Sequence, residues 1–427
     1  MSRRTRQSRA AARRVRLRRR QDRRFERARK PSAVLHALTS SALALPGLAL
    51  RASAASAPTE VRTQYSFSRY AEDKLKSGKV DVGNERSRYD IDIHQFRFET
   101  GLTDRLDIGV DLAHEAMSGA TPWYVTPGPN GGDPVQVMTQ ATIEERRTDA
   151  LLASNLYLDR GKATLGAGVS LENDYLAING SLGGERQLNE KNTTLSGGIG
   201  ASVDRITPSD TNLFPERPKE EDKQSYDVFI GLGQVLGRNT NIQSSLKYQH
   251  ATGFLSDPYK RAFVAGIPET DERPDQRNQL SWLTRYRHHV TALDGSLHFD
   301  YKLYLDDWRM NSHTFELAWY QTLFDRIRLV PSLRYYSQSQ ADFYAPYYIG
   351  PRRDGLRSSD YRLSPFGAYS WKLKAETRFQ TWRFVWDASV AWERYTSDGD
   401  LALQSVDVEN PGLVSFNLFS VGLTARF

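Results

Sequence analysis

The sequence contains no cysteine, which excludes disulfide bonds, thiolate metal ligands and cysteine nucleophiles. It also has no run of 18 or more consecutive apolar residues, which is about the length that a membrane-spanning helix requires. Any membrane-embedded form of this chain must therefore be a closed β-barrel, because only helices and closed barrels satisfy every backbone hydrogen bond in lipid. An apolar content of 39% and a mean hydropathy of −0.60 agree with a barrel, in which only alternate residues face lipid.

The common motifs of catalysis are missing as well. The sequence has no Gly-x-Ser-x-Gly, no His-Glu-x-x-His and no phosphate-binding glycine loop. His298 and Asp300 share an inward strand face with Arg285 and Arg287, but no serine stands out as a nucleophile beside them. We therefore expect a protein that is not an enzyme.

One short loop carries two carboxylates near a histidine. Asp306, Asp307 and His313 could hold a divalent ion across this loop. Carboxylates in loops are much more often simply solvated, so we expect no metal site here. Nothing else in the sequence points to a cofactor.

The formal charge of +7 comes from the N-terminal segment. The first 30 residues hold 15 Lys or Arg against Asp22 and Glu26, which gives +13 and leaves −6 for the rest of the chain. Such an Arg-rich run is typical of a nucleic-acid arm. However, a modest apolar stretch over 32–50 and small residues over 52–57 follow it, which is a secretory pattern. We assign residues 1–57 to a leader and signal peptide, with cleavage after Ala54, and expect no nucleic-acid partner.

From Val61 onward, apolar and polar residues alternate in segments separated by turn residues. Leu297, Phe299 and Tyr301, for example, alternate with His298 and Asp300, whereas a helix would scatter these apolar residues around its circumference. Sixteen such segments lie near 61–70, 89–102, 106–114, 146–158, 162–172, 175–188, 192–206, 223–236, 240–252, 279–289, 294–305, 311–323, 327–339, 359–374, 383–395 and 413–427. The predicted fold of residues 58–427 is all-β: a transmembrane antiparallel β-barrel of about 16 strands.

The connections between these segments are of two kinds. Three-residue turns at 103–105, 159–161 and 324–326 alternate along the chain with long loops rich in Pro, Gly, Asp and Asn. Long loops lie near 71–88, 114–145, 207–222, 253–278, 340–358 and 396–410, with short exceptions near 173 and 306–310. We expect the short turns to be periplasmic and the long loops to be external. Pro331 and Pro365 fall inside predicted strands, where we expect a β-bulge or a local shortening.

The chain ends on a pattern that resembles the closing-strand signal of bacterial outer-membrane barrels. Ser420, Gly422, Ala425 and Phe427 occupy its polar, glycine, apolar and aromatic positions. Val421, Leu423, Ala425 and Phe427 would then face lipid. The resemblance implies an outer-membrane location in a Gram-negative bacterium, with outer-membrane lipid and the barrel-assembly machinery as partners.

Charged residues on the polar strand faces should line the lumen, because a charge facing lipid costs about 2 to 4 kcal/mol at the midplane. The three-residue turns place Arg97 opposite Asp111 and Glu316 opposite Arg334, and the preceding hairpin brings Lys302 beside Glu316. We expect cross-strand ion pairs among these residues, although a solvated lumen wall is the simpler interpretation. The strand-end tryptophans are interpreted as an interfacial girdle rather than as a carbohydrate-stacking surface. They are Trp282, Trp319, Trp371, Trp382 and Trp392.

Several stretches together resemble one family of Gram-negative outer-membrane barrels that is known only as a domain of unknown function. They are 118–124, 172–175, 191–196, 256–260, 306–308, 312–320, 334–344 and 397–400. The resemblance implies a barrel in the outer membrane and supplies no substrate and no catalytic residue. It also implies a partner role beside a periplasmic redox system.

The function expected from the sequence is a porin-like channel for a small solute. The alternative is a structural or scaffold barrel that docks a periplasmic redox or assembly partner and has its lumen plugged by paired charges. Sixteen strands are enough to enclose an aqueous channel, unless the loops fold inward.

Overall fold

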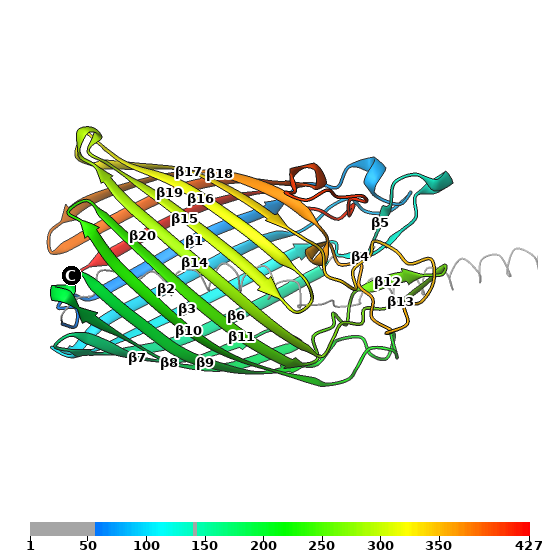
Figure 1. Ribbon diagram of the computed structural model, residues 1–427, viewed down its shortest axis with the longest axis horizontal. Coiled ribbons are helices and arrows are strands. Elements are labelled where there is room, and N and C mark those ends of the chain that lie inside the picture. The colour runs from blue at the N-terminus through cyan, green and yellow to red at the C-terminus, as the bar shows by residue number, and fades with distance from the viewer. Residues whose placement is uncertain (1–55, 140–142) are drawn as a thin grey trace, which may run out of the picture.

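In the computed structural model, which describes residues 56–139 and 143–427, sixteen antiparallel strands form one closed barrel (Figure 1). The first eight are β1 (Arg62–Glu72), β2 (Asp90–Thr103), β3 (Leu106–Gly119), β6 (Ile143–Leu158), β7 (Gly161–Leu171), β8 (Tyr175–Leu188), β9 (Thr193–Ile206) and β10 (Glu221–Gly237). The other eight are β11 (Thr240–Gly253), β14 (Gln276–Val290), β15 (Gly295–Asp306), β16 (Asn311–Leu323), β17 (Ile327–Gln338), β18 (Phe366–Thr381), β19 (Phe384–Asp398) and β20 (Ser415–Arg426). This confirms the predicted fold and strand count.

The barrel closes between its first and last strands. β1 pairs with β20 from Arg62↔Arg426 to Glu72↔Phe416, and the amide of Phe427 donates to the Val61 carbonyl at 3.1 Å. Every strand of the barrel therefore has two neighbours, and the barrel has no unpaired edge within the described residues. The leader assigned to residues 1–57 lies outside the described residues, apart from Ser56 and Ala57.

One predicted strand is misplaced. The segment expected at 359–374 is β18, which begins at Phe366 and runs to Thr381. Residues before it fold instead as a short 3-10 helix, Tyr361–Leu363, because the Asp360 side chain accepts a hydrogen bond from the Arg362 amide. Pro365 consequently precedes the strand, so the structure shows at this proline the expected local shortening rather than a β-bulge.

At Pro331, where we expected a β-bulge or a local shortening, the structure has no β-bulge but a local gap in the ladder. The ladder between β16 and β17 is recorded from Ser312↔Gln338 to Ala318↔Ser332, and again from Gln321↔Leu329 in the same register. The pairs at Pro331 and the residue before it are skipped, because proline has no N–H to donate. Pairing resumes without an inserted residue.

The two ends of the barrel differ. Turns of two to four residues join the strands at the end where the C-terminus lies, which we call the turn end (Figure 1). The long connections gather at the opposite end, the loop end, and carry two small hairpins of their own. These are β4 (Pro122–Thr126) with β5 (Val135–Met138), and β12 (Arg261–Val264) with β13 (Ile267–Thr270).

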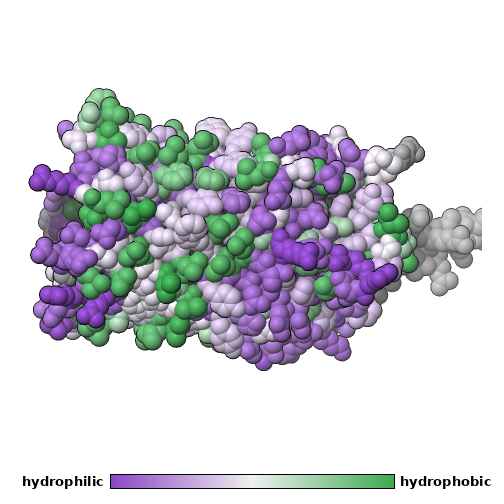
Figure 2. Space-filling view, viewed as in Figure 1, coloured by the Kyte–Doolittle hydropathy of each residue, from purple (hydrophilic) through white to green (hydrophobic). Residues whose placement is uncertain are grey.

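The barrel surface has an apolar belt between two polar ends. In Figure 2 the green residues gather over the strands, and the loop end at the right is mostly purple. Leu152, Ile178 and Ile230 belong to this belt, with 49%, 59% and 62% of their surface exposed. Such a belt suits contact with lipid acyl chains. No helix among the described residues is long and apolar enough to cross a membrane.

Candidate functional site

The register of the barrel sorts its charged residues into two walls of the lumen, because directly opposed residues of an antiparallel pair point to the same face. The lumen side of β14–β18 forms the basic wall. Its cations are Arg277, Arg285, Arg287, Lys302, Arg328, Arg334, Lys372, Lys374 and Arg378, against the carboxylates Asp300, Asp306, Glu316 and Glu376.

The lumen side of β2–β10 forms the acidic wall. Its carboxylates are Glu99, Asp107, Asp111, Glu115, Glu145, Asp149, Glu185, Asp204, Glu221 and Asp227, against the cations Arg97, Arg147, Lys162 and Lys223. In the strand order, β11 separates the two walls on one side, and β19, β20 and β1 separate them on the other. Opposite signs of charge therefore face each other across the lumen.

Carboxylates of the acidic wall are held by protein donors. Arg97 Nε lies 2.7 Å from an Asp111 carboxylate oxygen, as the ion pair expected between these residues requires. Lys223 Nζ lies 2.8 Å from Asp204. Asp107 accepts from Tyr157 at 2.7 Å and from the amide of Asn155 at 2.9 Å. Most of this wall is therefore neutralised or hydrogen-bonded within the protein.

The expected pairing of Lys302 with Glu316 is wrong. Leu305 pairs with Asn311 across the hairpin, so Asp300 stands opposite Glu316, and Lys302 stands opposite Thr314. The shift is two residues, which keeps both side chains in the lumen but changes their partners.

Arg334 does stand opposite Glu316 in the ladder between β16 and β17. Within the described part of the chain, however, Lys302, Glu316 and Arg334 form no ion pair with one another at 4 Å or less. The sequence thus predicted correctly that these three side chains face the lumen, but the ion pairs expected among them do not form.

The inward group around His298 and Asp300 is occupied by ion pairs. Asp300 lies 3.6 Å from Arg285 Nε and forms a second ion pair with Arg287. The His298 ring packs on the Tyr320 ring, with centroids 4.1 Å apart. Because two guanidinium groups hold the carboxylate, it does not orient the imidazole as a catalytic dyad would.

These side chains line a cavity of about 830 Å³ at the turn end of the lumen, between β8–β11 and β14–β15. Its charged lining consists of Lys191, Arg238, Arg285, Arg287, Glu185 and Asp300. Cations outnumber carboxylates two to one in this set. The volume falls within the range of small-molecule sites, which runs from about 300 to 1,000 Å³.

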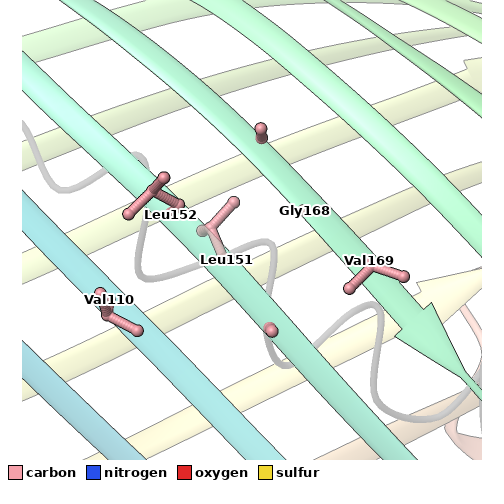
Figure 3. A pocket seen from close by; sticks show the side chains of 7 residues that line it. Val110, Leu151, Leu152, Gly168 and Val169 are labelled. Carbon is pink, nitrogen blue, oxygen red and sulfur yellow. The ribbon is translucent and has the colours of Figure 1, made fainter.

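A second hollow, of about 300 Å³, lies on β3, β6 and β7 (Figure 3). Val110, Leu152 and Val169 of its lining hold lipid-facing positions in the register. The small side chains of Ala150 and Ala167 create the hollow between them. An apolar hollow on this face suits an acyl chain rather than a polar ligand.

The two carboxylates considered as metal ligands form contacts with other side chains. Arg277 Nη2 lies 2.6 Å from Asp306, and Asn278 donates to Asp307 from its side chain at 2.6 Å. His313 stands opposite Leu303 on the lipid-facing side, where Tyr301 Oη lies 2.9 Å from its Nδ1. The three side chains therefore do not converge.

The long loops of the loop end form a folded layer that we call the cap, consisting of residues 73–89, 120–139, 207–220, 254–275, 339–365 and 399–414. Contacts between different loops hold it together. Lys260 Nζ donates to the Pro122 carbonyl at 2.8 Å, and the Asn410 amide donates to the Ser359 carbonyl at 3.1 Å. Lys79 and Glu409 form an ion pair. The cap spans the mouth of the barrel at this end.

A buried ionic cluster lies at the centre of the cap. Arg273 Nη2 lies 3.0 Å from Asp360 and its Nε lies 2.6 Å from Asp271. Arg362 pairs with Asp360 and, at 2.9 Å, with Asp257. The Asp271 and Asp360 side chains have no exposed surface. Since each carboxylate has a guanidinium partner, the charges are compensated in place.

Titration of this cluster follows from burial and charge together. Burial alone would raise the pKa of Asp360, but Arg362, Lys260 and Arg273 outweigh it and hold this pKa well below its ordinary value. Burial lowers the pKa of Lys260 to about 8, opposed by Asp360 and assisted by Arg362. The cap therefore holds a lysine that titrates near neutral pH.

The residues of the closing-strand signal lie in β20 and just after it. Ser68 Oγ donates to Ser420 Oγ at 2.8 Å inside the lumen, and Gly422 faces the lumen between Ser66 and Ser389. Ala425 stands on the lipid-facing side. Phe427 packs edge-on against Phe384, with ring centroids 5.2 Å apart.

The tryptophans expected in a girdle lie on the outer surface. Trp282, Trp371 and Trp392 are between 39% and 44% exposed. Trp319 also holds a lipid-facing position, opposite Leu297. Trp382 lies in the turn between β18 and β19, with 82% of its surface exposed. It therefore lies directly after the end of β18, in agreement with the strand-end position that the sequence predicted.

The sequence did not reveal the buried cluster of the cap, because its members come from two loops about 90 residues apart. Asp257 and Lys260 of the cluster belong to the stretch 256–260, one of those that resemble the barrel family. The signal that could have found the cluster is the presence of unlike charges in the loop 253–278 and at Asp360 and Arg362, but these two residues fall inside the strand predicted at 359–374.

The structure is similar to several solved barrels. For a bacterial polysaccharide outer membrane secretin the TM-score is 0.45 at 8% identity, over 86% of this chain and 99% of that one. For CdiB from Acinetobacter baumannii it is 0.47 at 8% identity, over 85% and 60%. For OpdK from Pseudomonas aeruginosa, solved with vanillate, it is 0.39 at 9% identity, over 86% and 98%. Likenesses of this degree carry no information about a solute or partner of this chain.

No curated protein matches the chain. A family model, in contrast, matches residues 35–413, which is most of its length. This match confirms the resemblance to an uncharacterised barrel family that the sequence stretches indicated. The chain therefore belongs to the family described as "Protein of unknown function (DUF3570)".

Proposed function

We propose that this protein is a non-enzymatic conduit for a small polar solute in the outer membrane of a Gram-negative bacterium. The observation that carries the proposal is the closed barrel whose charged walls enclose a cavity of about 830 Å³. Charged side chains inside a wide barrel keep its interior wet, whereas an inert structural barrel could be filled with apolar side chains.

The orientation follows from the two ends. We place the turn end in the periplasm and the cap outside the cell, so the cap sets access from the medium. The apolar belt contacts outer-membrane lipid, and β20 with Phe427 serves as the strand that the barrel-assembly machinery receives. The segment 1–57 directs secretion in this scheme.

Planar bilayers test the conduit directly. The purified protein should give stepwise conductance, and Arg362→Gln, which weakens the buried cluster of the cap, should increase the conductance or its frequency. Asp354→Asn is the matched control, because its carboxylate pairs with Arg352 on the exposed surface of the cap. Bilayers that stay closed with both the wild type and Arg362→Gln would count against a conduit.

The cap favours one alternative function, a scaffold that docks a periplasmic redox or assembly partner. An ionic layer across the mouth would seal the barrel. A scaffold tolerates such a seal, because it does not need to pass a solute. Phe324 and Trp382 are 87% and 82% exposed in turns at the periplasmic end and are suitable positions for a photo-crosslinker. Capture of one defined periplasmic protein, together with closed bilayers, would favour the scaffold.

A further inference from the structure

Lys302 of the lumen lies within electrostatic range of two other cations, and of the three only Lys247 has a carboxylate within 4 Å among the described residues. Lys302 interacts electrostatically with Arg334 and with Lys247, and both of these are positive. They come from β11, β15 and β17, so the arrangement depends on the closed barrel and not on one hairpin. We call these three residues the lumen cation cluster.

The protein supplies few acceptors to this cluster. Lys247 Nζ lies 3.4 Å from Asp227, but within the described part of the chain Lys302 and Arg334 have neither a hydrogen bond nor an ion pair. Arg334 Nε is buried and lacks an acceptor among the described residues. Glu316, the nearest carboxylate in the ladder, is not within 4 Å of either cation and is exposed to the lumen.

Such an arrangement is unfavourable unless an anion shares it. Like charges repel, and a buried guanidinium N–H without an acceptor loses its hydrogen bond to water. Elsewhere in the same barrel, Arg97, Lys223 and Arg277 each have a carboxylate within 3 Å. Lys302 and Arg334 therefore differ from these three cations by having donors to spare.

The cluster adjoins the cavity at the turn end. Lys302 is the next inward residue after Asp300 on β15, and Asp300 lines that cavity. Along this line Arg287 and Arg285 come first and Lys302 follows, so a solute moving away from the turn end meets successive cations. Guanidinium and ammonium groups in this order suit a carboxylate or a phosphate, which both groups bind with charge-assisted hydrogen bonds.

From these observations we infer that the lumen cation cluster of Lys247, Lys302 and Arg334 is a binding site for the oxyanion group of a small solute, a carboxylate or a phosphate. This inference deepens the proposed function, since it assigns a solute class to the conduit. It does not require that the conduit be open, because the site would bind an anion from the periplasmic side even in a sealed barrel.

Calorimetry with inorganic pyrophosphate and with succinate on the full-length barrel in neutral detergent tests the site. Lys302→Gln and Arg334→Gln should each weaken binding of the preferred anion about tenfold, as loss of one charge-assisted hydrogen bond predicts. The double variant should abolish measurable binding. Lys162→Gln, which removes an inward cation from the acidic wall, is the matched control and should stay within about twofold of wild type.

Glu316→Gln provides an independent test of the site in case the double variant fails to fold. Removing this carboxylate beside Arg334 should tighten anion binding several-fold, whereas a residue with only a structural role would leave affinity unchanged. Wild type that binds neither anion, or a folded double variant that binds as wild type does, would overturn the inference. So would a Glu316→Gln barrel that binds no more tightly than wild type.

Ion selectivity in bilayers separates this inference from the conduit itself. Under a potassium chloride gradient, the wild type should favour chloride, and the double variant should lose that preference. Anion binding in detergent with closed bilayers would support the site and refute the conduit. Conductance without anion preference and without anion binding would refute the site and leave the conduit standing.

Discussion

Replacing Asp360 by asparagine should open the cap without unfolding the barrel. The Asp360 side chain has no exposed surface and accepts from Arg273 at 3.0 Å and from Arg362 Nε at 2.8 Å. Breaking a buried ion pair from one side costs about 3 to 5 kcal/mol, because the remaining charge is left buried. Here Arg273 keeps Asp271 and Arg362 keeps Asp257, so we expect the lower end, about 3 kcal/mol.

A loss of about 3 kcal/mol corresponds to a roughly hundredfold larger population of the open cap. Hydrogen exchange measures this population at amides bonded within the cap, such as Leu363, which donates to the Asp360 carbonyl at 2.9 Å, and Ala341, which donates to the Leu363 carbonyl at 3.0 Å. Strand amides of the barrel should exchange as in wild type, and the exposed Asp354→Asn should change cap exchange less than about fivefold. Cap amides that keep their wild-type rates in Asp360→Asn would refute the view that this cluster holds the cap closed.

Three further changes probe the cap, the lipid face and the packing of the loops. The stability of the closed cap should rise between about pH 8 and pH 10.4, because Lys260 loses its proton near pH 8 in the closed cap and near 10.4 when solvated. Hydrogen exchange of the cap amides across this pH range measures the rise, and Lys260→Met should remove it. Ile230→Arg should destabilise the folded barrel in lipid by about 2 to 4 kcal/mol in urea titrations, whereas Gln249→Arg, which points into the lumen, should cost less than about 1 kcal/mol. Gly367→Ala should lower the thermal stability of the cap, since its Cβ would lie 1.9 Å from a backbone oxygen of the loop after β19, while Gly237→Ala has open space around it and should be neutral.

Alternation of apolar and polar residues was enough to predict the barrel, because a lipid-facing strand must place an apolar side chain at every second position. Fifteen of the sixteen predicted segments overlap their strands closely, and the exception is β18. Its predicted start at 359 failed because Ser359, Asp360 and Arg362 act as cap residues and not as strand residues. A local sequence pattern cannot show that Asp360 forms an ion pair with Arg273 of another loop.

The cap illustrates the same limit on a larger scale. Each of its loops is polar and rich in turn residues, which by itself indicates a solvated connection. Only the assembled barrel brings Asp257, Lys260, Asp271, Arg273 and Asp360 together, and only then do their charges become buried. Burial turns an ordinary lysine into one with a pKa of about 8, a property that no sequence window contains.

The error at Lys302 has the largest consequence for function. Assuming the wrong hairpin register placed Glu316 beside both Lys302 and Arg334, so that one carboxylate would pair with two cations. With Leu305 paired to Asn311, the face is preserved but the partner changes, so Glu316 stands beside Asp300, whose charge two arginines already balance. Lys302 is then left near Arg334 and Lys247. A two-residue register shift thus removes the carboxylate expected beside Lys302, and its ammonium group is left available to an anion in the site that we infer.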